Sequence, residues 1–308
     1  MGESKVRDVK GDRVETINCI LCGQAGDRVV IVENGFQGRR CDACGVIFVS
    51  PRPSRAEVAT IYASDAAYVS SAGQIRPSAG ERLHAQLTLN LLRRHRARGR
   101  LVEIGGGGGH FAVAARTAGF DVSVTEMNPV DCEQIRSLGI PCSESLDADC
   151  DIVYACDVLS HFYDPDSELR TIHSHLRPAG LLVLETGNLG DVDERYLSRF
   201  SRFQYPDHLF FFGEVSLRRL LAGAGFRVVA VHRYGILPSL WALAMKERLV
   251  AAAPGREASR GVRSSPAKGS WKRDALGIVL HLVRYSLGSF LAQPGRPQTI
   301  IVVAEKID

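Results

Sequence analysis

The stretch LVEIGGGGGHF, residues 101–111, decides the fold of this chain of 308 residues. An apolar segment with an acid near its end leads into five consecutive glycines and then into residues that favour a helix. Glycine permits positive φ angles and close approach of a ligand, and the start of a helix offers free N–H groups. The stretch therefore predicts a strand, a ligand-binding turn and a helix. The turn alone leaves the ligand open, because Gly107, Gly109 and Ala112 also satisfy the GxGxxG/A spacing of dinucleotide-binding folds.

Strands and helices alternate beyond this turn. Apolar segments at 100–104, 121–125, 151–155 and 180–185 predict strands, and helix-length segments at 110–118, 129–138 and 166–176 lie between them. A helix over 213–226, a strand over 227–234 and a last strand at 298–304 are expected to follow. This alternation predicts an α/β fold with a doubly wound, Rossmann-like sheet.

Four cysteines precede this region as two CxxC pairs with eighteen residues between them: Cys19, Cys22, Cys41 and Cys44. The pattern predicts a closed tetrahedral Zn²⁺ site, and four sulfur ligands leave no position for a reacting water, so the zinc is expected to be structural. Two disulfides or four unrelated thiols are the less favoured alternative. The other cysteines lack metal-like spacing and are interpreted as buried or incidental thiols: Cys132, Cys142, Cys150 and Cys156.

Composition narrows the function classes. The net charge of +4 and the pI near 8.6 are mildly basic and do not by themselves indicate nucleic acid. No apolar run reaches the length of about 18 residues that a membrane helix needs. The polar start MGESKVRDVKGDR lacks an apolar signal core, so a cytoplasmic protein is expected.

Several motifs together resemble those of the class I S-adenosylmethionine-dependent methyltransferases. The turn has the ExGxGxG spacing of motif I in that family. Residues 155–165, ACDVLSHFYDP, are similar to its DVLEHxxDP segment, with Ser160 in place of the usual Glu, and residues 176–185, LRPAGLLVLE, are similar to its LxPGGxLxxE passage. The resemblance spans about residues 100–230, in the family's order.

The resemblance implies a binding site for S-adenosyl-L-methionine. Glu103 is expected near the ammonium group of the cofactor, Glu126 at the ribose hydroxyls, and residues 143–146 beside the adenine. An ordinary exposed acid is the alternative for each glutamate. The residues assigned to the cofactor are Glu103, Gly105, Gly107, Gly109, Glu126, Met127, Glu144, Ser145 and Asp157.

A second resemblance concerns the acceptor. The CxxC ribbon together with QYPDH, residues 204–208, resembles elements of sugar C-methyltransferases of natural-product pathways, although Pro206 departs from their pattern. It proposes His208 as the general base, with Tyr205 and His161 orienting acceptor oxygens. Asp207, Tyr62 and Tyr68 are expected to face the substrate. A purely structural His208, packed under the aromatic run that follows it, is the alternative.

The expected domain organisation follows from these motifs. Residues 1–15 form a flexible tail, 16–53 the zinc ribbon, 54–98 a helical connector or lid, and 99–308 the methyltransferase domain with a helical insertion at about 236–297. The insertion is interpreted as a lid or a dimer contact in preference to a membrane-surface element. A monomer and a homodimer are both compatible with the sequence.

The expected function is methyl transfer to a small molecule such as a sugar, a nucleotide-linked sugar or another secondary-metabolite intermediate. Carbon, nitrogen and oxygen acceptors stay open. An RNA methyltransferase that uses the ribbon to grip nucleic acid is an alternative, but the ribbon offers few aromatic side chains for stacking on bases. A non-catalytic zinc- or cofactor-binding protein and a dinucleotide oxidoreductase are weaker alternatives.

Overall fold

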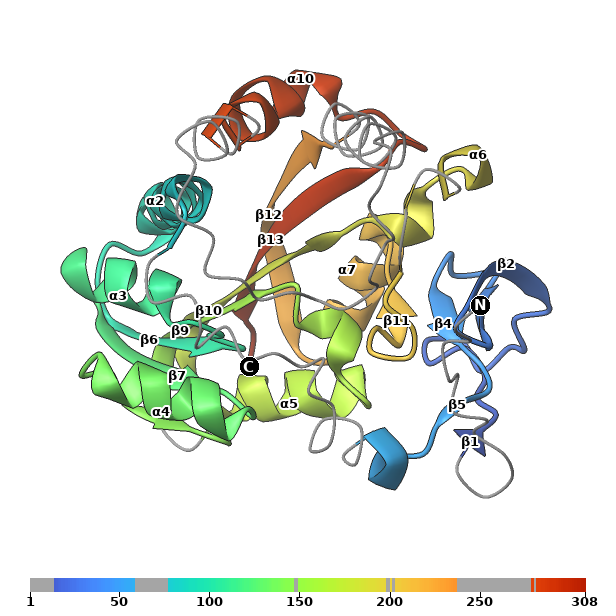
Figure 1. Ribbon diagram of the computed structural model, residues 1–308, viewed down its shortest axis with the longest axis horizontal. Helices are drawn as coiled ribbons and strands as arrows, with labels where there is room; N and C mark the ends of the chain where they lie inside the picture. Colours follow the sequence, from blue (N-terminus) through green and yellow to red (C-terminus); the bar gives the residue numbers. More distant parts are fainter. Residues whose placement is uncertain are drawn as a thin grey trace, which may run out of the picture.

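A seven-stranded sheet forms the centre of the molecule, with the strand order β12-β13-β10-β9-β6-β7-β8 (Figure 1). The structure is a computed structural model that describes residues 14–58, 77–146, 149–197, 200, 203–236, 278–279 and 281–308. Neighbours from β10 to β8 pair in parallel, whereas β13 is antiparallel to both β10 and β12. The predicted doubly wound α/β fold is confirmed.

The elements of this domain match the expected ranges closely. The strands are β6 (Arg100–Ile104), β7 (Asp121–Thr125), β8 (Cys142–Ser143), β9 (Cys150–Cys156), β10 (Leu176–Gly187), β12 (Phe226–Gly235) and β13 (Gln298–Lys306). The helices are α2 (Ala79–His95), α3 (His110–Thr117), α4 (Pro129–Ser137), α5 (Pro165–His175), α6 (Glu194–Leu197), α7 (Glu214–Gly223) and α10 (Gly288–Leu291), with short turns η2 (Leu159–His161), η3 (Leu189–Asp191) and η4 (Val283–Leu287).

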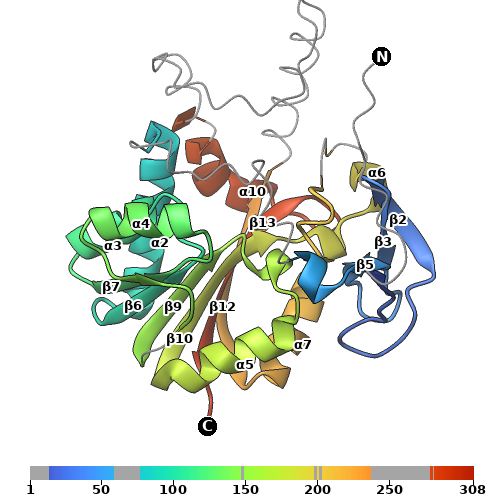
Figure 2. The same cartoon turned by 60° about the horizontal axis from the view of Figure 1, so that its bottom comes forward.

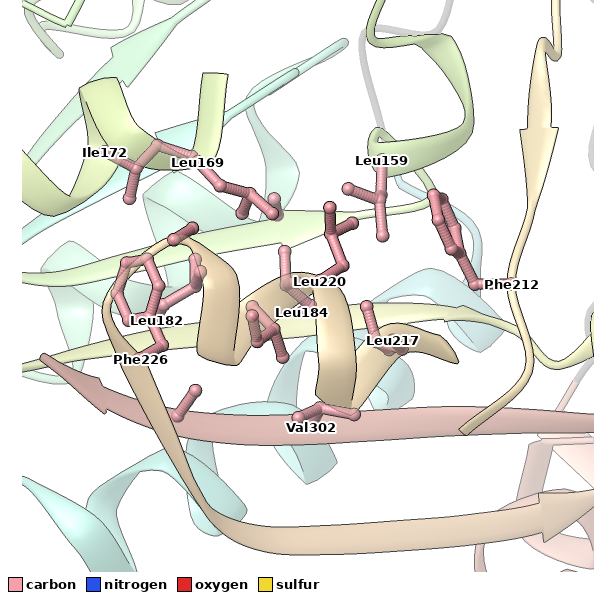
Figure 3. Packing of buried hydrophobic residues seen from close by; sticks show 14 of the residues in the cluster. Leu159, Leu169, Ile172, Leu182, Leu184, Phe212, Leu217, Leu220, Phe226 and Val302 are labelled. Atoms are coloured by element: carbon pink, nitrogen blue, oxygen red, sulfur yellow. The ribbon is translucent and has the colours of Figure 1, made fainter. Parts of the chain in front are cut away.

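Two helical layers cover the sheet. Helices α2, α3 and α4 lie on one face, and α5 and α7 lie on the other (Figure 2). Apolar side chains of each layer pack against the strands. In the second layer Leu169, Leu217 and Leu220 meet the strand residues Leu184 and Val302 (Figure 3). With both faces covered, the carboxyl ends of the parallel strands are the edge at which this class of sheet binds ligands.

Local signals set where the helices begin. Ser78 caps α2 in a capping box with Glu81, and the Asn128 side chain accepts hydrogen bonds from the N–H groups of Val130 and Asp131 at the start of α4. Asp164 caps α5, and Pro165 fills the first helical position. These caps fix the loops between strand ends and helices, where the site is built.

A second sheet belongs to the amino-terminal part of the chain, and one of its strands comes from far away in the sequence. Its order is β11-β4-β3-β2, formed by β2 (Arg28–Glu33), β3 (Phe36–Arg40), β4 (Ile47–Val49) and β11 (Phe210–Phe211). A separate pair joins β1 (Val14–Glu15) to β5 (Arg52–Pro53). Phe210 lies opposite Phe48, and Phe211 opposite Ile47. No local sequence pattern predicts β11, and this strand ties residues 204–211 to the ribbon.

The structure corrects the interpretation of two cysteines. Cys132 on α4 and Cys142 on β8 are joined as a disulfide, with their Cα atoms 5.6 Å apart, so the interpretation of these two residues as unpaired thiols is wrong. The fold brings together two cysteines that have no recognisable spacing. Tyr62, Tyr68, most of the tail, the region 59–76 and most of the insertion lie outside the described residues. None of the helices in the described part of the chain has the length and hydropathy of a membrane span.

Candidate active site

The glycine turn lies at the carboxyl end of β6. Gly105, Gly107 and Gly109 all have positive φ angles, of 73°, 49° and 74°. A Cβ atom at Gly105 would lie 2.6 Å from Val158 Cγ2, so a larger residue would be both strained and crowded there. The turn therefore needs glycine for its conformation, independently of any ligand.

Glu126 holds this turn from the end of β7. Its Oε2 accepts a hydrogen bond from the Gly107 N–H at 3.0 Å, and its Oε1 accepts one from the Asn128 N–H at 2.9 Å. A carboxylate has about four acceptor positions, so two N–H donors leave capacity for hydroxyl groups of a ligand. The geometry brings Glu126 and the glycine turn together, as the cofactor assignment requires.

Glu103 is buried beneath the turn. Its side chain is 6% exposed, and its Oε2 atom has no hydrogen-bond partner within the described residues. Burial raises the pKa of Glu103 to about 8, and the nearby Glu126 adds to this rise. A cation next to the buried Glu103 carboxyl group would favour its ionised form, because the opposite charge stabilises the anion.

The remaining residues assigned to the cofactor lie at the same edge of the sheet. Met127 is 77% exposed at the end of β7, and Glu144 and Ser145 are exposed after β8. Asp157 follows β9 with a φ angle of 54°, and its N–H donates to the Glu185 carbonyl at 2.8 Å. Together these side chains surround the carboxyl ends of β6, β7, β8 and β9.

The four amino-terminal cysteines converge on one point. Their sulfur atoms all lie within 4.8 Å of one another, and the Cys22 and Cys41 sulfurs are 3.5 Å apart. Zinc–sulfur bonds of about 2.3 Å in a tetrahedron place sulfurs about 3.8 Å apart, so the spacing suits zinc. Arg219 on α7 donates to the Cys44 sulfur at 3.3 Å. The cluster is thus linked to α7, which packs on the central sheet.

The two knuckles share one backbone design. The N–H groups of Gly23 and Gly45 donate to the carbonyls of Cys19 and Cys41 at 2.8 and 2.7 Å. Both glycines have φ angles near +73°. Four thiolates this close repel one another, so a bound cation is what would stabilise them. The arrangement therefore fits the zinc expected from the sequence.

His161, Asp207 and His208 form a polar cluster between η2 and the loop before β11. His161 Nδ1 and Asp207 Oδ1 are 3.1 Å apart. The rings of His161 and His208 meet edge to face, with their centroids 4.4 Å apart. Burial and then His161 lower the pKa of His208 to about 4. His208 is therefore neutral near pH 7 and has a lone pair to accept a proton. It also contacts the ring of Phe211 edge-on at 5.7 Å, as the structural alternative anticipates.

Tyr205 lies outside the cluster of His161, Asp207 and His208. Its side chain is 2% exposed, and a Cβ atom added at Gly38 of β3 would overlap its hydroxyl group. The backbone around it is held by the ribbon: Glu33 accepts hydrogen bonds from the N–H groups of Phe203 and Tyr205, and Asn34 donates to the Tyr205 carbonyl at 2.7 Å. The structure therefore places Tyr205 in the ribbon core instead of on a surface that an acceptor could reach.

Replacing Tyr205 with phenylalanine tests this position. Among the residues that the structure describes, none gives the buried Tyr205 hydroxyl a hydrogen bond, which costs about 1–3 kcal/mol, so Tyr205→Phe is expected to leave the free energy of unfolding unchanged or to raise it by about 1 kcal/mol. Tyr154→Phe is the matched control: its buried hydroxyl donates to Glu185, and its loss is expected to destabilise. A Tyr205→Phe protein that folds stably yet loses methyl transfer would restore the orienting role.

A second cluster at the edge of the sheet was not anticipated. Glu185, at the carboxyl end of β10, is 3% exposed and is contacted by His84 Nε2 at 2.8 Å and by the Tyr285 hydroxyl at 2.7 Å. Burial acts to raise the pKa of Glu185, but the hydrogen bond from His84 and further partners outweigh it and lower the pKa. Glu185 is the last residue of the motif at 176–185, and this position is the sequence signal that points to Glu185 as a site residue.

A comparison with solved structures gave matches at low sequence identity. The [4+2]-cyclase SpnF is 17% identical (TM-score 0.44, covering 71% of this chain and 79% of that chain). The cyclopropane synthase MmaA2 from Mycobacterium tuberculosis is 15% identical (TM-score 0.44, covering 71% of this chain and 83% of that chain). Coclaurine N-methyltransferase bound to N-methylheliamine and SAH is 13% identical (TM-score 0.45, covering 71% of each chain). A comparison with curated protein sequences gave no significant match.

The family comparison is more direct. Residues 77–231, which are 155 of the 308 residues, match the family described as methyltransferase domain. The matched region begins just before α2 and ends within β12, so it contains the glycine turn, Glu126 and the segment after β9. The chain belongs to the class I methyltransferase family.

Proposed function

We propose that this protein transfers the methyl group of S-adenosylmethionine to a small-molecule acceptor, such as a sugar, a nucleotide-linked sugar or another secondary-metabolite intermediate. One observation carries the proposal. The segment that follows β9 contains both Asp157, on the edge with the glycine turn, and His161, four residues later, in the histidine cluster. A cofactor site and a group that can accept a proton are therefore adjacent on one short segment.

The residues at the carboxyl edge fit the cofactor. Glu103 Oε2 is buried and has no hydrogen-bond partner in the described part of the chain, and the ammonium group of S-adenosylmethionine is a donor of the required charge. Glu126 would take the ribose hydroxyls with its remaining acceptor positions, while Gly105 allows close approach. When bound, the cofactor supplies an activated sulfonium methyl group. The protein's own tasks are then to align an acceptor and to remove its proton.

His208 is proposed as the group that accepts this proton, with His161 oriented beside it by Asp207. If Asp207 accepts a hydrogen bond from His161 Nδ1, the tautomer of His161 is fixed with a lone pair on Nε2. A base with a pKa as low as that of His208 is weak in the free protein. It suits an acceptor whose proton becomes acidic as the new bond forms, as happens when a hydroxyl oxygen is methylated.

The ribbon is proposed to hold a structural zinc ion and, through it, the acceptor side of the site. Cys19, Cys22, Cys41 and Cys44 would supply all four ligands. The ribbon in turn holds residues 203–211 through Glu33, Asn34 and the β4–β11 pairing. In this arrangement zinc supports the position of His208 without taking part in the chemistry.

The pH dependence tests His208. Its pKa near 4 means that the neutral form, the proton acceptor, predominates above that pH and is lost as pH falls through it. With an acceptor found by screening metabolites for a methyl mass increment, kcat/KM is expected to stay flat from pH 7 down to about 5 and to fall tenfold per pH unit below about 4. His208→Gln is expected to lower kcat/KM by about 100-fold or more and to remove this acid limb. Wild-type activity in His208→Gln would exclude His208.

Calorimetry separates the function classes. The protein is titrated with S-adenosylhomocysteine, with NAD and with a short RNA. Binding of the first alone supports the proposed function. Tight RNA binding that weakens steeply with salt would instead favour the RNA methyltransferase, and NAD binding without S-adenosylhomocysteine binding would overturn the cofactor assignment.

A further inference from the structure

A partly open cavity lies on the α2 face of the sheet. It has a volume of about 220 Å³ and is lined by side chains of α2, β12 and β13 and by Tyr285 of η4. This is several times the share of about 30 Å³ that one water molecule takes in the liquid. Its wall includes apolar Leu87, Leu91 and Ile301 and polar Thr88, Arg94 and His232. The cavity has room for a small organic group with a polar end.

Two polar atoms in this wall have no partner within the described residues. Thr88 is 1% exposed, and its hydroxyl makes no hydrogen bond. The Nε2 atom of His232 is also buried and unbonded. Buried polar groups are almost always hydrogen-bonded in folded proteins, so unsatisfied ones in the wall of one cavity indicate that something else supplies the partners.

The charge of the cavity is positive. Arg94 is exposed, and in the described part of the chain it takes part in no ion pair. Burial, and then His95, Arg94 and Arg233, lower the pKa of His232, so its charged neighbours are cations. The buried carboxylate of Glu185, behind the wall residue Tyr285, is held by the Tyr285 hydroxyl and is paired with His84.

We propose that this cavity binds the phosphate or carboxylate group of a small metabolite. The Arg94 guanidinium would supply the charge, and the Thr88 hydroxyl and the His232 Nε2–H would each donate a hydrogen bond to the anion. Charge-assisted hydrogen bonds of this kind are the strong ones in proteins. Tyr234 and Tyr285, whose rings meet at 4.8 Å, would cover the apolar body of the ligand. This site is separate from the proposed cofactor and acceptor sites.

Titration of the full-length protein with inorganic phosphate and, separately, with acetate tests the proposal by calorimetry and distinguishes the two anions. At least one is expected to bind at a single site. Arg94→Met is expected to weaken that binding about tenfold or more, because a charge-assisted contact is lost. Arg93→Met is the matched control: this neighbouring arginine does not line the cavity, and its loss is expected to change affinity by less than about twofold.

Thr88→Val removes the buried hydroxyl at nearly constant volume and is expected to weaken the same anion. Arg94 is exposed, so its variant keeps the test decisive if Thr88→Val does not fold. S-adenosylhomocysteine affinity, measured in parallel, is expected to be unchanged in the Arg94 and Arg93 variants. Absence of binding for both anions at millimolar concentration, or equal weakening by Arg93→Met and Arg94→Met, would overturn the proposed site.

Discussion

Replacing Cys41 with serine is expected to release the proposed zinc ion and to lower kcat/KM for the acceptor by about 100-fold or more, while S-adenosylhomocysteine still binds. Cys41 is 1% exposed and belongs to the four-sulfur cluster. Structural zinc sites contribute about 10–16 kcal/mol of apparent binding free energy, so losing a ligand removes much of what holds the ribbon. Displacing catalytic groups by about 1 Å is enough for a 100-fold loss.

The path from Cys41 to His208 is short. Cys41 directly follows β3 and opens the second CxxC pair, and β4 comes just after that pair. β4 pairs with β11, which begins two residues after His208. Glu33 and Asn34, in the β2–β3 hairpin, hold the backbone at residues 203–205. A ribbon without its metal therefore cannot keep His208 against His161. The cofactor edge is supported separately, by the packing of α2, α3 and α4 on the other face.

Metal content and S-adenosylhomocysteine affinity are measured on the same sample, by mass spectrometry and by calorimetry. Cys150→Ser is the matched control, because Cys150 is also fully buried but lies outside the ribbon, and a serine hydroxyl could keep its contact with the His175 carbonyl. Cys41 also belongs to the buried hydrophobic cluster that includes side chains of β9 and β10. Equal loss of cofactor and acceptor binding would therefore mean that the ribbon supports the entire fold.

The sequence predicts the sheet well because its signals are local. Each expected strand is a short apolar run, and the starts of α2, α4 and α5 carry their own side-chain caps, such as Asn128 before α4. The four segments proposed to face the cofactor follow the ends of β6, β7, β8 and β9, and parallel strands place their carboxyl ends at one edge. Periodicity and turn chemistry are sufficient for this part of the molecule.

What could not be predicted depends on contacts between distant segments. β11 has only two residues and exists because Phe210 and Phe211 pair with β4, more than 160 positions earlier. The same contact draws Tyr205 into the ribbon core, although its motif suggested a role beside the acceptor. The Cys132–Cys142 pair and the contacts of Glu185 with His84 and Tyr285 likewise join positions whose proximity no local pattern encodes.

Replacing Glu126 with glutamine is expected to weaken S-adenosylhomocysteine binding by about 100-fold or more. The carboxylate accepts from two backbone N–H groups, at Gly107 and Asn128, and charge-assisted bonds of this kind contribute about 1.5–3 kcal/mol each. A glutamine has one acceptor oxygen, and its NH₂ group would face an N–H donor. The turn would then lose its conformation as well as its acceptor for the ribose hydroxyls.

The control for this variant is Glu133→Gln, because Glu133 is exposed on α4 and holds no part of the turn. It is expected to change S-adenosylhomocysteine affinity by less than about threefold, since an exposed charge contributes little. Thermal unfolding of both variants separates a local effect from a global one: Glu126→Gln should melt within a few degrees of wild type, because α3 and α4 keep their packing on the sheet. If Glu126→Gln binds S-adenosylhomocysteine as tightly as wild type, the carboxylate only shapes the turn and the ribose must be held by another residue at this edge.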